Sequence, residues 1–313
     1  MQSHLKNYSS IQNIALFLFL LLLPSEGMTA GKTIGVIMTE NIAYYKEIHK
    51  TFAESLPAED FGPGNAEIVL QSPNAESMSW TNAARKLVAV GADVIIAYGA
   101  PATLAALHET TDIPIIFAGV YDPLSVGIAG ANTTGISSKE PIASLLKNFK
   151  SISNFASLGV VFSDSEKDSV MQANEVKQLE GGLGFRSVLF NVKKAEDSSK
   201  IANVDALLLT TGCATIYCVN KIISLARKVK IPTASTIDSG DNSGVILTIS
   251  ANPSEQGREA ARLASRVMKG AKPSSLPMEW PKKIDMIINL KEATSLGLKI
   301  PFDLLTSATK VIK

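Results

Sequence analysis

The sequence has little net charge. Its 313 residues include 30 Lys and Arg against 29 Asp and Glu, which gives a formal net charge of +1. A nucleic-acid partner requires clustered basic side chains that displace counterions, whereas the basic residues of this chain are scattered. The densest cluster, Arg227, Lys228 and Lys230, falls late in an expected helix and is interpreted as a solvated face. The composition therefore argues against a nucleic-acid partner.

Cysteine and histidine are also scarce. The two cysteines, Cys213 and Cys218, lie five residues apart, a spacing that places their side chains on different faces of a helix. This favours two free, packed thiols over a disulfide, although the sequence does not decide between them. The three histidines, His4, His49 and His108, are too few for a metal cluster, and no metal or cofactor is predicted.

An unbroken apolar run, IALFLFLLLL, occupies residues 14–23. About ten apolar residues are too few to cross a bilayer core, which takes roughly 20. Lys6 and no acid precede the run, and proline and small residues follow it, which is typical of a secretory signal peptide. We predict a signal peptide over residues 1–30, cleaved after Gly27 or after Ala30, with an uncleaved membrane anchor as the alternative. No cysteine directly follows the run, so we expect a soluble periplasmic protein without a lipid anchor.

The chain contains an internal repeat. TIGVIMTE at 33–40 matches SLGVVFSD at 157–164, because each has a hydroxyl residue, an apolar residue, glycine, three apolar residues, a hydroxyl residue and an acid. Three further pairs follow in the same order: NAEIVLQ (65–71) with FRSVLFN (185–191), DVIIAYGAPAT (93–103) with DALLLTTGCAT (205–215), and IPIIFAGVYD (113–122) with IPTASTID (231–238). Four matches in one order indicate two copies of one unit.

Each copy alternates short apolar strands with stretches of helical period. Strands of about four to seven residues without polar alternation are buried on both faces, as in a parallel sheet between helix layers. The strands that begin at Asp93 and Asp205 each follow a helix closely, which suits right-handed βαβ crossovers. We therefore predict an α/β fold with two doubly wound, parallel-sheet domains of the Rossmann type.

Small and polar residues collect where the predicted strands end. In an open parallel sheet, ligands bind outside the carboxyl ends of the strands. Gly99 and Gly212 would let the backbone approach a ligand, and the helix after each glycine can hold an anion at its N-terminus. Asp122 and Asp238, each at the end of an Ile-Pro strand, are predicted anchors for a cation or for hydroxyl donors, with a simple turn as the alternative. The segments at this edge are 39–40, 99–101, 121–122, 163–165, 211–213 and 238–239.

Four segments resemble motifs of one protein family. GVYDPLSVGIAG at 119–130, followed by TTGIS, is similar to TDPVxAGLV…NVTGVS, and SDSEKDSV at 163–170 is similar to NPxExNSV. GREAARLASRVMKGAKPSSLPME at 257–279 resembles GRQAGxxAxxILKGxKPxDIPVE, and INLKEATSLGLKIP at 288–301 resembles INLKxAxxLGLxIP. These are motifs of ABC-transporter substrate-binding proteins, periplasmic binding proteins of type I, in the family that includes tryptophan- and tyrosine-binding members. The resemblance covers essentially the whole chain after the predicted signal peptide.

The resemblance implies two lobes joined by a three-strand hinge. It places the helix at 257–269 in the first lobe and the strand around Met286 in the second. A small polar ligand, an amino acid or a similar molecule, would bind between the lobes of a monomer, and hinge closure would deliver it to the ABC permease subunits in the membrane. The first lobe is expected to comprise residues 31–150 and 251–280, and the second residues 151–250 and 281–313.

An amino acid would suit the predicted site. Its carboxylate would meet backbone N–H groups at the helix starts near Ala100 or Cys213, and its ammonium would pair with Asp122 or Asp238. Two departures from the family pattern, at 250–258 and 211–214, fall on expected pocket positions, so the identity of the ligand stays open. The predicted ligand-binding residues are Thr39, Glu40, Tyr44, Gly99, Ala100, Pro101, Ala102, Tyr121, Asp122, Ser163, Ser165, Ser169, Gly212, Cys213, Ala214 and Asp238.

An enzyme and a sensor are the alternatives to a transport protein. No G-x-S-x-G nucleophile motif is present, although Cys213 at a helix start could act as a nucleophile. Duplicated α/β racemases use one thiol from each half, whereas both cysteines here lie in the second half, so no enzymatic activity is predicted. A repressor would need a DNA-binding headpiece and a receptor would need a transmembrane helix after residue 280. Neither pattern occurs, which leaves delivery of the ligand to a separate membrane sensor as the second reading.

Overall fold

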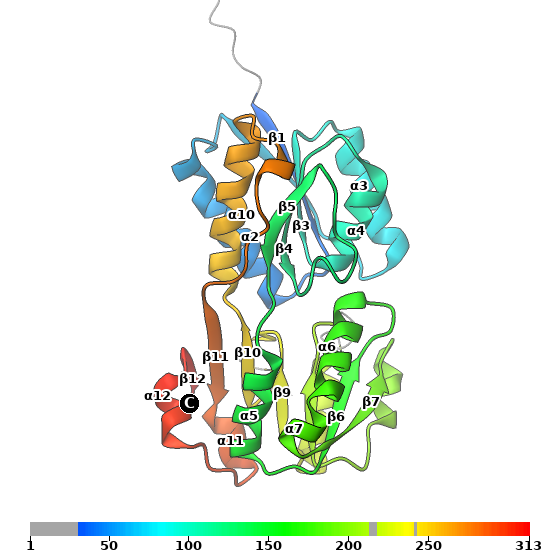
Figure 1. Ribbon diagram of the computed structural model, residues 1–313, viewed down its shortest axis with the longest axis vertical. Coiled ribbons are helices and arrows are strands. Elements are labelled where there is room, and N and C mark those ends of the chain that lie inside the picture. Colours follow the sequence, from blue (N-terminus) through cyan, green and yellow to red (C-terminus); the bar gives the residue numbers. More distant parts are fainter. Residues whose placement is uncertain (1–30, 213–217, 241–242) are drawn as a thin grey trace, which may run out of the picture. The chain divides into compact units, whose positions relative to one another are not determined.

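The computed structural model describes residues 31–212, 218–240 and 243–313. The predicted signal peptide and two of the predicted site residues, Cys213 and Ala214, lie outside this part of the chain. The described chain is organised around two sheets (Figure 1). We call each sheet, together with the helices that pack on it, a lobe. Among the described residues, no helix combines the length and apolar character needed to cross a membrane.

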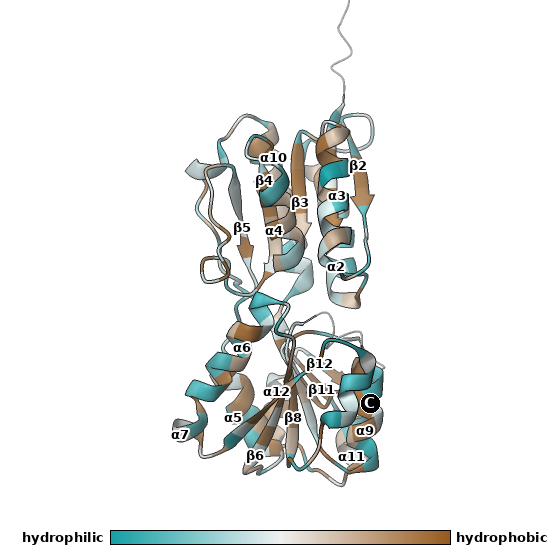
Figure 2. Ribbon diagram, turned by 90° about the vertical axis from the view of Figure 1, so that its right-hand side faces the viewer, coloured by the Kyte–Doolittle hydropathy of each residue, from teal (hydrophilic) through white to brown (hydrophobic). Residues whose placement is uncertain are grey.

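The first lobe is built on a five-stranded parallel sheet in the order β2-β1-β3-β4-β5. Successive residues of its strands face opposite sides, so Ile34 and Val36 pack with α2 and α10, whereas Ile37 packs with α3 and α4. Figure 2 shows that the strands are mostly hydrophobic, as burial on both faces requires. The elements of this lobe are β1 (Lys32–Met38), α2 (Ala43–Ser55), the 3₁₀ helix η2 (Leu56–Glu59), β2 (Ala66–Gln71), α3 (Ser77–Ala89), β3 (Val94–Tyr98), α4 (Ala100–Glu109), β4 (Ile115–Val120), β5 (Thr133–Ser137), α10 (Pro253–Met268) and the 3₁₀ helix η4 (Pro273–Ser275).

Helix α10 lies late in the chain and packs against α2 and β4 of the first lobe. Gly257 permits this close approach, because a Cβ at this position would overlap the carbonyl oxygen of Ile48 and lie 2.8 Å from the backbone nitrogen of Phe52. We therefore propose to assign α10 to the first lobe, where the sequence prediction placed it. The strand that contains Met286, β11, pairs with β10 in the other sheet, and we propose to assign it to the second lobe.

The second lobe is built on a seven-stranded sheet in the order β12-β11-β10-β9-β8-β6-β7. All neighbouring strands are parallel except β10 and β11, which are antiparallel. Its elements are α5 (Ile142–Ile152), β6 (Ser157–Phe162), α6 (Lys167–Gln178), α7 (Glu180–Leu183), β7 (Arg186–Asn191), the 3₁₀ helix η3 (Ala195–Lys200), β8 (Ala206–Leu209), α9 (Val219–Lys228), β9 (Thr233–Ser235), β10 (Leu247–Ala251), β11 (Ile284–Asn289), α11 (Leu290–Ser295), α12 (Phe302–Ser307) and β12 (Lys310–Ile312).

The two sheets repeat one strand order. The order β2-β1-β3-β4-β5 of the first sheet matches β7-β6-β8-β9-β10 of the second, strand for strand in the order of the sequence. The same side-chain contact also recurs, because Asp93 accepts a hydrogen bond from the backbone N–H of Thr33 and Asp205 accepts one from Ser157, both at 2.8 Å. The predicted duplication and the predicted α/β fold are both confirmed.

Helix α5 packs in the second lobe, where Leu145, Leu146 and Phe149 share a core with Leu158 of β6. The predicted lobe boundary after residue 150 cuts through this helix. The amphipathic pattern of a helix shows that one face is buried, but it does not show which sheet buries that face. We propose to place this boundary before α5.

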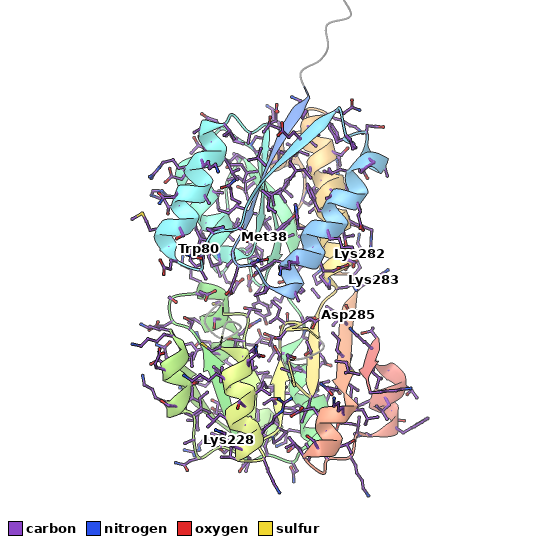
Figure 3. The ribbon with its side chains drawn as sticks, turned by 180° about the vertical axis from the view of Figure 1, so that it is seen from behind. Met38, Trp80, Lys228, Lys282, Lys283 and Asp285 are labelled. Carbon is purple, nitrogen blue, oxygen red and sulfur yellow. The ribbon has the colours of Figure 1, made fainter. Side chains whose placement is uncertain are left out.

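Three segments connect the lobes: residues 138–141, Asn252 and residues 280–283. The second and third are tied together, since the side chain of Asn252 donates to Asp285 at 2.8 Å and its backbone N–H donates to the carbonyl of Lys283 at 3.0 Å. The carboxylate of Glu255 accepts the backbone N–H groups of Lys282 and Lys283, which lie beside Asp285 in Figure 3. We call this group of contacts the paired connection.

Candidate ligand-binding cleft

Loops from both lobes line one pocket with a volume of about 1340 Å³. These loops follow β1, β2 and β3 in the first lobe, and β6 and β7 in the second. The pocket therefore lies at the carboxyl ends of parallel strands, where the fold class places ligands. Its lining residues are Glu40, Asn41, Ser72, Pro73, Asn74, Ala75, Glu76, Ser77, Trp80, Thr81, Ala100, Pro101, Leu104, Ala105 and His108 from the first lobe, and Ser165, Glu166, Lys167, Lys193, Lys194 and Glu196 from the second.

The first-lobe wall is organised around Thr39, which is fully buried. Its carbonyl oxygen accepts a hydrogen bond from Nε1 of Trp80 at 2.7 Å, and its hydroxyl accepts one from the backbone N–H of Ala102 at 3.2 Å. These bonds join the end of β1 to α3 and to the start of α4. Gly99 precedes α4 with φ of 89°, and a Cβ there would press on the hydroxyls of Thr39 and Tyr45, so glycine is required.

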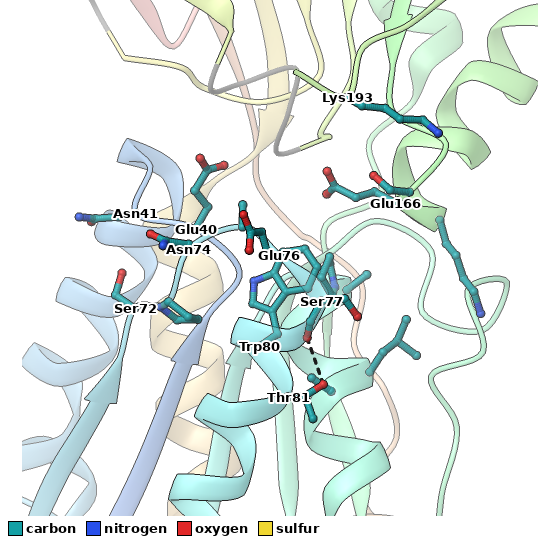
Figure 4. Close-up of a pocket in the computed structure, with 18 of the residues that line it drawn as sticks. Glu40, Asn41, Ser72, Asn74, Glu76, Ser77, Trp80, Thr81, Glu166 and Lys193 are labelled. Carbon is teal, nitrogen blue, oxygen red and sulfur yellow. Dashed lines mark hydrogen bonds between the residues drawn. The ribbon is translucent and has the colours of Figure 1, made fainter. Parts of the chain in front are cut away.

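The pocket combines an apolar wall with charged rims. Pro101, Leu104 and Ala105 of α4 and Trp80 of α3 supply the apolar part, all from the first lobe. Figure 4 shows the carboxylate of Glu76 next to Trp80 and that of Glu40 beyond it, with Glu166 and Lys193 on the second lobe. Lys193 also pairs with the carboxylate of Asp164 at 2.9 Å within its own lobe. This combination suits a small ligand with an apolar body and charged groups.

Four of the predicted site residues line this pocket: Glu40, Ala100, Pro101 and Ser165. Thr39 and Ala102 are buried behind its wall, as described above. Ser163 and Ser169 are also buried and support the second-lobe loop. The backbone N–H of Ser163 donates to the hydroxyl of Ser169, whose oxygen lies 2.7 Å from the hydroxyl of Thr210. The predicted role of these residues in ligand binding stays a prediction.

Tyr121 and Asp122 lie away from the pocket lining, in a contact between the loop after β4 and α6. The hydroxyl of Tyr121 donates to Glu175 at 2.6 Å, and its backbone N–H donates to Asp168 at 2.9 Å. Asp122 is 8% exposed, pairs with Lys139 at 2.7 Å and accepts the N–H of Ser125. Burial opposes ionisation of Asp122, but the hydrogen bonds from Lys139 and Ser125 outweigh it and hold its pKa below the usual value. These contacts fit the turn alternative for Asp122, because both its oxygens already have partners.

Tyr44 and Asp238 do not line this pocket, but they lie near each other. Burial, together with the charges of Glu140, Asp285 and Asp238, raises the pKa of the Tyr44 hydroxyl far above its usual value. Asp238 is partly exposed and accepts the N–H of Gly240 at 2.8 Å. The first and second lobes therefore place one tyrosine and one carboxylate of the predicted set near each other. Gly212, which ends the described part of its loop, is buried.

The predictions missed two segments of the pocket. The segment after β2 carries Glu76 and leads into α3 with Ser77 and Trp80, and the loop after β7 carries Lys193. The repeat contained the signal, because NAEIVLQ and FRSVLFN were matched as equivalent strands, and equivalent strands end at the same edge. Gln172 was also missed. It is fully buried, and its side-chain oxygen accepts from the N–H of Thr211 at 2.9 Å and from the hydroxyl of Thr236 at 3.0 Å, which ties two second-lobe loops together. No sequence pattern marks such a residue.

Among the described residues, no group of three or more His, Cys, Asp and Glu side chains is arranged to hold a metal ion.

Comparisons with known proteins agree with this architecture. A tyrosine-binding protein from Clostridioides difficile (strain R20291) is 24% identical over 281 residues, which span 86% of this chain and 81% of that protein. The solved structure of an ABC domain from Streptococcus pneumoniae in complex with L-Trp has a TM-score of 0.86 at 23% identity, covering 90% of this chain and all of that chain (100%). A conserved domain protein from Vibrio cholerae has a TM-score of 0.85 at 23% identity, covering 90% of this chain and 99% of that chain. The family of ABC transporter substrate binding proteins matches residues 34–312, and the chain belongs to this family.

Proposed function

We propose that the protein is the exported solute-binding component of an ABC importer. It captures an amino acid between its lobes as a monomer, closes around it, and delivers it to permease subunits in the membrane. The observation that carries this proposal is a single pocket lined by loops of both lobes. A ligand can favour the closed arrangement only if it contacts both lobes, because closure must add contacts that the open state lacks.

The connections between the lobes support closure by a hinge. Each of the three is short, and the residues at their ends are held by the first lobe on one side and by the second on the other. Gln256, fully buried in α10, donates to the carbonyl of Ser137 at 2.9 Å and accepts the N–H of Gly119 at 2.9 Å, so it fixes the first connection to the first lobe. Bending is thereby confined to a few residues, as in other hinge-closing proteins.

An aromatic amino acid is the ligand that the cleft and the relatives favour together. A relative is named for tyrosine, and a structure of the same fold was solved with L-Trp. The pocket of this chain offers an apolar wall for a large side chain and charges of both signs at its rim. Glu40 and Glu76, at the rim of the apolar wall, are the proposed partners of the ligand ammonium, because Asp238 does not line this pocket. Asp122 is no longer proposed for this role, since Lys139 already neutralises it.

Thermal-shift measurements on the protein without residues 1–30 test the proposal, with the proteinogenic amino acids, short peptides, purines and sugars as probes. A ligand present at a hundred times its dissociation constant stabilises the folded state by about 2.7 kcal/mol, which raises the melting temperature by roughly 5 °C or more. We expect this shift with aromatic amino acids. A shift only with purines or sugars would contradict the proposed ligand class, and no shift with any probe would contradict the proposed function.

Closure itself has a separate readout. The radius of gyration, measured by small-angle X-ray scattering, should decrease when the stabilising amino acid is added. If the amino acid binds and the radius of gyration does not decrease, the proposed ligand class stands but the proposed hinge closure is contradicted.

A further inference from the structure

Trp80 is the one Trp, Tyr or Phe side chain among the residues that line the pocket, within the described part of the chain. It lies in the first turn of α3 and is partly exposed. The sequence gives it no special mark, since a tryptophan three residues into a helix reads as ordinary core packing. Figure 4 instead shows its ring at the pocket, beside the carboxylate of Glu76.

The hydrogen bond of Trp80 determines what this ring can offer a ligand. Indole has one polar group, the Nε1–H donor, and it is already bound to the carbonyl oxygen of Thr39 at 2.7 Å. The ring therefore contributes only its apolar faces and edges. Its anchor is rigid, because Thr39 is also held by its own N–H, which donates to the carbonyl of Tyr98 at 2.9 Å, and by the start of α4.

The neighbours of Trp80 extend the same surface. Pro101, Leu104 and Ala105 continue the apolar wall on α4, and α3 and α4 pack side by side. Glu40 and Glu76 lie at the rim of this wall and create a negative potential next to it. A flat ring stacked on the indole, with a cationic group directed to the carboxylates, would match both parts of the surface.

We propose that Trp80 determines specificity in the cleft by stacking on the aromatic ring of the bound amino acid. This inference rests on the proposed function and deepens it. Trp80 discriminates aromatic from aliphatic side chains of similar size, because offset stacking of two rings adds favourable binding free energy to that gained from the buried area alone.

Tryptophan fluorescence tests this directly, because the chain contains two tryptophans, Trp80 and Trp280. Trp280 is 49% exposed and does not line the pocket, so Trp280→Phe leaves Trp80 as the only emitter. The probes are L-phenylalanine and L-tyrosine, excited where only tryptophan absorbs, with cyclohexylalanine as a non-aromatic side chain of similar size. We expect saturating L-phenylalanine or L-tyrosine to change the intensity and wavelength of Trp80 emission. Stabilisation of the protein by these probes with unchanged emission would overturn the inference.

Affinity measurements by calorimetry provide the second readout. Trp80→Leu should weaken binding of L-phenylalanine about tenfold and change the affinity for cyclohexylalanine by less than about threefold. Trp80→Phe should restore most of the selectivity, since it restores an aromatic face. The matched control, Trp280→Leu, should leave both affinities unchanged.

The outcomes separate the inference from the proposed function. An equal loss of affinity for both probes, or a lower melting temperature with unchanged selectivity, would assign Trp80 a packing role and overturn the inference. Binding of aliphatic amino acids alone would also overturn it and would leave an amino-acid-binding protein. If no amino acid binds the wild-type protein, both the inference and the proposed ligand fail.

Discussion

Asp168→Asn tests the contact between α6 and the loop after β4. Asp168 is 7% exposed, and it accepts hydrogen bonds from the backbone N–H groups of Tyr121 at 2.9 Å and Asp122 at 3.5 Å. Burial raises the pKa of Asp168 from 3.8 to about 6, against the opposing effect of the two N–H groups and with a further contribution from the charge of Asp122. The carboxylate is therefore held in a site that favours its neutral form.

The direction and size of the effect follow from this pKa. The folded protein binds a proton at Asp168 more readily than the unfolded chain does, so ionisation of Asp168 lowers the free energy of unfolding as the pH rises from 3.8 to 6. A difference of about 2 pKa units corresponds to about 3 kcal/mol, of which about 2 kcal/mol falls between pH 4 and pH 7. The asparagine variant lacks this titration. The free energy of unfolding of the wild type, minus that of the variant, should therefore increase by about 2 kcal/mol when the pH decreases from 7 to 4.

Urea unfolding followed by circular dichroism at a series of pH values measures this difference. Asp122 and Glu140 also titrate near this contact, but both proteins contain them, so their contributions largely cancel in the difference. Asp303→Asn, which removes an exposed carboxylate from α12, is the matched control and should show no such trend. A difference between wild type and Asp168→Asn that is constant across this pH range, or that changes in the opposite direction, would refute the reasoning.

Three further substitutions probe the fold and the cleft. Asp122→Ala should lower the free energy of unfolding by about 1 kcal/mol, because it breaks the pair with Lys139. The ligand-induced thermal shift should be unchanged, and loss of that shift would indicate that Asp122 binds the ligand. Gly257→Ala should lower the melting temperature by several degrees in differential scanning fluorimetry, since a Cβ there meets the backbone of α2. An unchanged melting temperature would show that α2 and α10 can move apart without loss of stability. Lys193→Ala should weaken ligand binding severalfold in calorimetry. The control, Lys228→Ala, lies at the end of α9 away from the pocket (Figure 3) and should leave the affinity unchanged. Equal losses of affinity in both variants would exclude a direct contact between Lys193 and the ligand.

The fold could be predicted because its signals are local and repeated. Apolar strands such as 93–98 and 205–209 have no polar alternation, which is the pattern of burial on both faces. Each of the four matched pairs gave two independent sequences for the same strand, so each strand assignment was supported twice. The topology of α10 and β11 required the family resemblance, since nothing in an amphipathic helix or an apolar strand states which sheet it joins. The same limit applies to the predicted boundary at residue 150, which we propose to move because α5 packs in the second lobe.

The site could be predicted only to the level of its loops. The rule that ligands bind at the ends of parallel strands led to Glu40, Ala100 and Ser165, all of which line the pocket. The same rule cannot tell a residue that faces the ligand from one that holds the wall. Thr39 precedes Glu40 in sequence but is buried, and Asp122 is neutralised by Lys139, a residue from another loop whose position depends on the tertiary fold.

The paired connection has a mechanical consequence. Because Asn252 and Glu255 bind the backbone of residues 282–283, two of the three links between the lobes are joined by hydrogen bonds and would bend together in the proposed hinge. In the proposed hinge, two hydrogen-bonded segments would bend more easily out of their common plane than they would shear or twist, which would restrict closure to one direction. If the proposed hinge operates, removing the Asn252 side chain would allow lateral movement between the lobes and would misalign the two walls of the pocket on closure.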